Sequence, residues 1–82
     1  MQEQDILAAF TRTLRDLLGD DQISLAMDTT RDEVPSWDSL NYVSFIVAVE
    51  TEFAVKFRMA EIDSFVDVGA IVHAVVARGA AA

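Results

Sequence analysis

Hydrophobic residues recur at helical spacing in the first part of the chain. Between residues 3 and 18 they lie three or four positions apart, at Leu7, Phe10, Leu14 and Leu17. This spacing places their side chains on one face of a helix. Gly19 follows directly, where helices often end in the left-handed conformation that glycine adopts readily. The pattern therefore predicts an amphipathic helix over residues 3–18.

The chain then changes to a polar stretch, residues 19–37, in which apolar residues stand alone. These residues are Ile23, Leu25, Met27 and Val34. We interpret the stretch as a long ordered loop whose apolar side chains contact the core. Loops of this length without secondary structure of their own are uncommon in small domains and are often functional.

A second helix is predicted over residues 38–54. Asp38 is a good N-cap, because its carboxylate can accept hydrogen bonds from backbone N–H groups of the first turn. Two apolar stripes run along the helix: Phe45, Val49 and Phe53 form one, and Leu40, Val43 and Val47 form the other. One helix of so small a domain cannot be buried on every side, so we expect one stripe to be exposed. Exposed apolar stripes usually mark surfaces that bind partners.

Two further helices complete the predicted fold. A short helix is expected over residues 60–63 and a last helix over residues 66–77. Apolar residues at helical spacing predict the core face of the last helix: Val68, Ile71, Val72, Val75 and Val76. The fold class is therefore all-α, a small four-helix bundle with three long helices, one short helix, and a long loop between the first two. We expect a single domain over residues 1–82.

Charge narrows the range of partners. Fourteen acidic residues against six basic ones give a net charge of −8. Such a charge repels nucleic acid and anionic membranes and attracts basic protein surfaces. The polar, acidic N-terminus does not resemble a targeting signal, and the apolar stretch 66–77 is well short of the roughly 20 residues of a membrane span. We therefore expect a cytoplasmic protein with no nucleic-acid partner and no membrane insertion.

Residue counts also exclude classes of chemistry. The chain has no cysteine, so any thiol must come from a cofactor, and its single histidine, His73, excludes a two-histidine zinc site. Three residues, Asp28, Thr30 and Asp32, imitate the start of a calcium loop. However, Glu33 stands where the required glycine would be, and Ser39 where the bidentate acid would be. No metal site is predicted.

Ser39 is the remaining candidate for chemistry. Asp-Ser at the start of a helix is usually ordinary capping. Catalysis by serine needs a base within hydrogen-bond reach and an oxyanion hole. His73 lies in a mostly apolar stretch of the last predicted helix, and no G-x-S-x-G motif is present. These observations disfavour a hydrolase that uses Ser39 and His73, and they favour a serine that is modified in a protein that is not an enzyme.

Two acids close the second predicted helix. Glu50 and Glu52 lie near its C-terminus, where negative charge opposes the helix dipole. This placement indicates a role other than helix stability, and a basic protein partner is the natural candidate.

With these residues in place, the chain resembles the acyl carrier proteins. The resemblance covers nearly the whole chain. It rests on Asp38-Ser39-Leu40 opening the second helix, Glu50-Thr51-Glu52-Phe53 ending it, the short third helix, and the Phe65-x-x-Val68 entry into the fourth. Members of this family carry acyl groups as thioesters on a phosphopantetheine arm. The form Trp37-Asp38-Ser39-Leu40 is more typical of stand-alone, bacterial-type carriers than of peptidyl carriers.

The resemblance implies roles for particular residues. Ser39 would accept 4′-phosphopantetheine from coenzyme A in a reaction run by a separate phosphopantetheinyl transferase, which would make the chain a phosphoprotein. Asp38 would present Ser39 and approach the magnesium ion of the transferase. A docking face for partner enzymes is implied at Leu40, Val43, Val47 and Glu50. An acyl-chain pocket is implied at Phe45, Val49, Phe53 and Phe65.

The implied partners are the phosphopantetheinyl transferase, acyl-loading ligases or transferases, and synthases with basic docking patches. The chain itself is expected to be a monomer. Fatty-acid and polyketide biosynthesis are both open. At Asn41, Ser44 and Thr51 the chain is less acidic than typical fatty-acid carriers, so a specialised carrier is at least as well supported. The alternative is an acidic helical adaptor of the same fold that binds basic proteins and is never modified.

Overall fold

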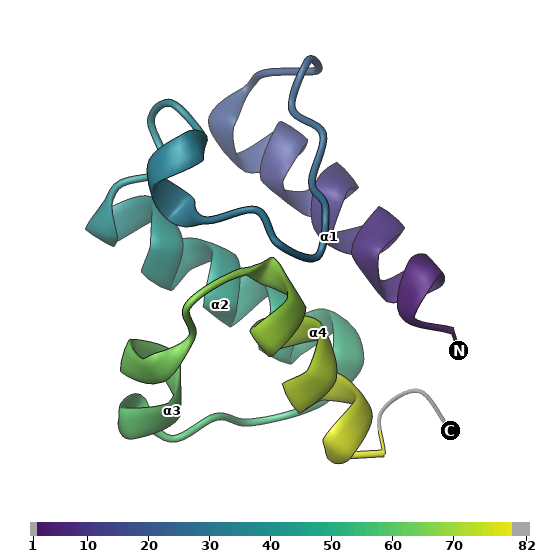
Figure 1. Ribbon diagram of the computed structural model, residues 1–82. Coiled ribbons are helices and arrows are strands. Elements are labelled where there is room, and N and C mark those ends of the chain that lie inside the picture. The colour runs from purple at the N-terminus through teal and green to yellow at the C-terminus, as the bar shows by residue number, and fades with distance from the viewer. Residues whose placement is uncertain (1, 80–82) are drawn as a thin grey trace.

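Four α-helices and one turn of 3₁₀ helix form the computed structural model, which describes residues 2–79 (Figure 1). In chain order they are α1 (Glu3–Leu18), η1 (Arg31–Glu33), α2 (Ser39–Phe53), α3 (Met59–Ser64) and α4 (Val68–Ala77). The described residues contain no β-strand. The predicted class, an all-α four-helix bundle with one short helix, is confirmed. None of the helices in this part of the chain combines the length and apolar character that a membrane span requires.

Helix α1 has the predicted bounds. Gly19 ends it with φ 66°, and the Gly19 N–H donates to the Arg15 carbonyl. Its buried face consists of Ile6, Ala9, Phe10 and Leu14. The predicted face included Leu17, which is 38% exposed because the buried stripe has drifted round the helix by its last turn.

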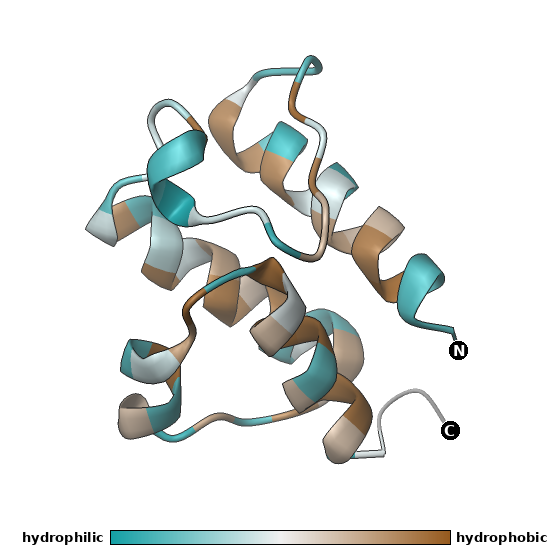
Figure 2. Cartoon of the chain, in the orientation of Figure 1, coloured by the Kyte–Doolittle hydropathy of each residue, from teal (hydrophilic) through white to brown (hydrophobic). Residues whose placement is uncertain are grey.

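Helix α2 packs one of its two stripes into the core. Phe45, Val49 and Phe53 are buried, and the ring of Phe10 in α1 meets Phe45 and Phe53 edge to face, with centroids 5.4 and 5.9 Å apart. Such pairs add about 0.5–1.5 kcal/mol to the burial of the rings themselves. Hydrophobic colour accordingly runs along the parts of α1 and α2 that face each other (Figure 2).

The long loop between α1 and α2 is ordered by its own apolar residues. Ile23, Leu25 and Val34 are buried, and Met27 packs against the core, as predicted. The turn η1 was not predicted. It forms because the Glu33 carboxylate accepts from the Thr30 N–H at 2.8 Å, while the Glu33 N–H donates to the Thr30 carbonyl. The bonds from Thr30 lower the pKa of the Glu33 carboxyl.

The loop is also joined to the start of α4 by two backbone hydrogen bonds. Val68 N donates to the Thr29 carbonyl at 2.9 Å, and Gly69 N donates to the Met27 carbonyl at 2.6 Å. A Cβ atom at Gly69 would lie 2.7 Å from the same Met27 oxygen. Glycine is therefore required here for the loop backbone to approach the helix.

Helix α4 starts later than predicted. The sequence pattern placed residue 66 inside it, but Asp67 is the N-cap, accepting from Ala70 N at 2.9 Å, and Val66 is 76% exposed in the linker before it. Four of the five predicted core residues are buried, and Val76 is not, with 41% of its surface exposed. Val76 projects about a quarter of a turn away from the centre of the buried stripe, which explains the error.

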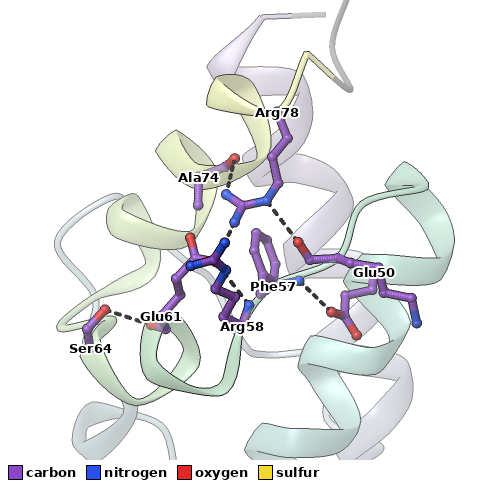
Figure 3. A network of polar contacts seen from close by, with 8 residues as sticks. Glu50, Phe57, Arg58, Glu61, Ser64, Ala74 and Arg78 are labelled. Carbon is purple, nitrogen blue, oxygen red and sulfur yellow. Dashed lines mark hydrogen bonds and ion pairs between the residues drawn. The ribbon is translucent and has the colours of Figure 1, made fainter.

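None of the residues of α3 is fully buried, so polar contacts, together with the partly buried Ile62, hold this helix in place. Arg78 follows the end of α4, and its guanidinium lies 4.8 Å from the centroid of the Phe57 ring. The same side chain donates a hydrogen bond to the Lys56 carbonyl at 2.9 Å and forms an ion pair with Glu61 (Figure 3). The Arg58 N–H also donates to Glu61, and these contacts lower the pKa of the Glu61 carboxyl, the backbone bond contributing most. On the other side, Tyr42 Oη donates to the Ile62 carbonyl at 2.7 Å.

Candidate functional site

Ser39 is the first residue of α2, and its side chain is exposed. Asp38 caps the helix as predicted, its carboxylate accepting from Asn41 N at 2.9 Å. The preceding Ser36 takes a left-handed conformation, φ 70°, and its carbonyl accepts from Asn41 Nδ2 at 2.8 Å. The chain segment around Ser39 is thus fixed on both sides while the hydroxyl group stays accessible.

Trp37 anchors the segment from below. The indole is 5% exposed, and its ring packs edge to face on Phe45 at 5.3 Å and on Tyr42 at 6.2 Å. The buried indole of Trp37 thus has a structural role. Its effect is to fix the entry angle of the loop into α2, and with it the direction in which Ser39 projects.

A hollow of about 230 Å³ opens beside Ser39. The side chains of Tyr42 and Val43 form its α2 wall, and those of Met59 and Ile62 form its α3 wall. A second hollow, of about 310 Å³, lies farther along α2 and shares Val43, Met59 and Ile62 with the first. Because they share these residues the two hollows are adjacent, and we call them together the groove between α2 and α3, with Ser39 at one end.

The residues implied as an acyl-chain pocket divide between two places. Phe45, Val49 and Phe53 are buried in the core, where Phe45 and Phe53 pack on Phe10, and they line neither hollow of the groove. Phe65 lines the hollow beside Ser39. Reasoning from sequence missed the other walls, because α3 is too short to show a periodic pattern.

The second stripe of α2 is exposed, as predicted. Leu40 is 76% exposed, Val43 51% and Val47 53%, and these three form an apolar surface that starts next to Ser39. Glu50 is only half-exposed, and its Oε2 accepts from the Phe57 N–H at 2.8 Å. Glu50 thus has a role within the chain beyond its own helix, because this hydrogen bond orders the segment between α2 and α3. Its contact with a basic partner stays a prediction.

His73 lies away from Ser39. Its Nε2 is 3.2 Å from the Glu3 carboxylate, and both side chains are exposed. Figure 1 shows the start of α1, where Glu3 lies, on the opposite side of the molecule from the start of α2. A Ser39–His73 pair is therefore not formed. Within residues 2–79 no group of three or more potential ligands could hold a metal ion.

Arg31, in η1, brings positive charge to the site. Its guanidinium lies 4.6 Å from the centroid of the Tyr42 ring, and the side chain lines the hollow that Ser39 lines. Asp63 of α3 lines the hollow on the other side. Nothing in the sequence pattern indicated a role for Arg31, because η1 was not predicted.

No protein-family model matches the chain, and a search of curated proteins finds no match. Among solved structures the chain is similar to one described as the solution NMR structure of holo acyl carrier protein from Geobacter metallireducens. The two are 32% identical, with a TM-score of 0.79 over 89% of this chain and 87% of the other.

Proposed function

This chain belongs to the acyl carrier protein family, and we propose that Ser39 is the residue through which it carries its cargo. Members of this family are carriers rather than enzymes. The observation that carries the proposal is the exposed Ser39 hydroxyl in the first turn of α2, held there by the Asp38 cap.

The residues around Ser39 fit a 4′-phosphopantetheine group. A helix start favours a phosphate, because unpaired backbone N–H groups and the helix dipole point toward it. The groove between α2 and α3 begins at the same residue and offers an apolar surface to the pantetheine portion of the arm. When attached, the group supplies the thiol that a chain without cysteine lacks.

In the proposed modification, Ser39 Oγ forms a bond to the pantetheine-bearing phosphorus of coenzyme A. The bond from that phosphorus to the oxygen of the second phosphate breaks, 3′,5′-ADP leaves, and the hydroxyl proton passes to the transferase or to solvent. Asp38 holds the first turn in place and, being exposed, can approach the magnesium ion of the transferase.

We assign partner docking to the exposed face formed by Leu40, Val43 and Val47, with Glu50 at its far end. Apolar contact supplies affinity, while the net charge of −8 steers basic patches of ligases, acyltransferases and synthases toward it. For the acyl chain we retain Phe65 together with Phe45, Val49 and Phe53 as the proposed shelter. The reduced acidity at Asn41, Ser44 and Thr51 supports a specialised carrier at least as well as one of general fatty-acid synthesis.

Intact mass spectrometry tests the proposal. The protein is incubated with coenzyme A, Mg²⁺ and a promiscuous phosphopantetheinyl transferase, beside Ser39→Ala and the matched control Ser44→Ala from the same helix. We expect the natural chain and Ser44→Ala to gain one phosphopantetheine unit and Ser39→Ala to gain none. No gain in the natural chain, with helical circular dichroism intact, would contradict the proposal and favour the unmodified adaptor.

A further inference from the structure

We propose that Arg31 binds the phosphodiester of the group attached to Ser39 and thereby holds the first part of the arm against the groove between α2 and α3. The inference rests on the proposed modification of Ser39. It assigns a positioning role to a residue of η1, an element separate from the helix that carries Ser39 and the docking face.

The first support is location. Arg31 and Ser39 line the same hollow, of about 230 Å³, although they come from different elements, η1 and α2. In the modified protein the phosphorus would be bonded directly to Ser39 Oγ. The phosphate oxygens would therefore lie next to the hollow that Ser39 and Arg31 both line. Among the residues that the structure describes, no other arginine or lysine lines it.

The second support is the state of the guanidinium. Arg31 belongs to neither ion pair of residues 2–79, although acids outnumber bases in the chain by fourteen to six. The Arg31 Cζ atom lies over the Tyr42 ring, 4.6 Å from its centroid, and Tyr42 is itself fixed by its hydrogen bond to the Ile62 carbonyl. This contact restrains the guanidinium group, whose N–H groups can form two parallel bonds to a phosphate.

The surrounding acids strengthen the choice of Arg31. Asp63 lines the α3 side of the hollow, and Asp38 caps α2 next to Ser39. Both carboxylates repel a phosphodiester, so the phosphate is driven toward the guanidinium rather than toward α3. With the phosphate held there, the arm leaves Ser39 over Tyr42 and Val43, at the mouth of the groove.

NMR spectroscopy of the loaded protein provides the test, with mass spectrometry first confirming one phosphopantetheine unit on each variant. The variants are Arg31→Gln and Arg31→Lys, and the matched control is Arg12→Gln, which removes the same charge from an exposed position on α1. On loading, we expect the Nε–H resonance of Arg31 to move and the other arginine Nε–H resonances to stay. We also expect the ³¹P resonance to depend on salt concentration in the natural chain and in Arg12→Gln.

In Arg31→Gln the ³¹P signal should lose this salt dependence and become narrower, because the phosphate is freed. Arg31→Lys should keep part of the salt dependence, since charge remains while the planar fork is lost. An unmoved Arg31 resonance on a fully loaded chain, with the same ³¹P signal in Arg31→Gln, would overturn this inference and leave the proposed function standing. Absence of any mass gain would overturn both.

Discussion

Two of the described residues other than glycine take a left-handed backbone conformation, and one of them ends α2. Ala54 has φ 55°, and its N–H donates to the Glu50 carbonyl. In this conformation a Cβ atom crowds the following carbonyl oxygen, at a cost of about 1–2 kcal/mol that glycine avoids. The stabilisation expected from glycine at position 54 is partly offset, because glycine also has a larger conformational entropy in the unfolded chain.

Ala54→Gly should therefore raise the free energy of unfolding by about 0.5–1 kcal/mol. Ala8→Gly, an exposed position in the middle of α1, is the matched control and should lower it by about 1 kcal/mol. Urea denaturation followed by circular dichroism measures both. Equal losses in the two variants would show that the left-handed conformation at residue 54 is absent in solution.

Tyr42 makes the stability of the folded chain depend on pH in the alkaline range. Burial of the half-buried phenol raises its pKa above 10.0, the nearby Arg31 opposing this. The folded state therefore favours the neutral phenol. The stability that this preference contributes is fully present below about pH 10 and is lost as the pH rises through the folded pKa. We expect the natural chain to lose more stability than Tyr42→Phe above pH 10. Parallel losses in both chains from pH 9 to 11, measured by urea denaturation, would contradict this.

At the scale of elements, the two helix ends that carry a local capping signal were easy to predict, whereas the start of α4 was not. Gly19 and Asp38 are local signals, and both act as caps. The site was predictable to the same extent, because Ser39 is placed by its own cap. The walls of the groove were not, since they bring together side chains from η1, α2, α3 and the linker after α3. Likewise, the bond from Phe57 N to Glu50 crosses a turn that no periodic pattern describes.

The attachment of α3 leads to a prediction about its dynamics. Since α3 has no fully buried residue and only Ile62 packs partly against the core, we expect its amide hydrogens to exchange faster than those at the centres of α1, α2 and α4. Arg78→Gln removes the side chain that joins Glu61 to the Lys56 carbonyl and should speed this exchange further. Arg12→Gln is the control and should not. Hydrogen exchange measured by NMR would contradict the prediction if α3 were as protected as α2.

At the scale of the whole molecule, charge opposes compactness. A net charge of −8 on 82 residues produces repulsion that salt screens. We expect the melting temperature at pH 7 to rise with sodium chloride and to rise at lower concentrations of magnesium chloride. Differential scanning calorimetry measures both series. A melting temperature that does not change from low to high salt would show that repulsion contributes little to stability.

The two backbone bonds from Val68 and Gly69 to the long loop also set an order of events on the ribosome. The loop and Ser39 are synthesised before Val68 and Gly69, the residues that hold the loop in place. A nascent chain thus exposes the serine before the fold that presents it exists. Under the proposed function, a transferase that recognises the folded start of α2 acts only once α4 has been made, and chains truncated before α4 escape modification.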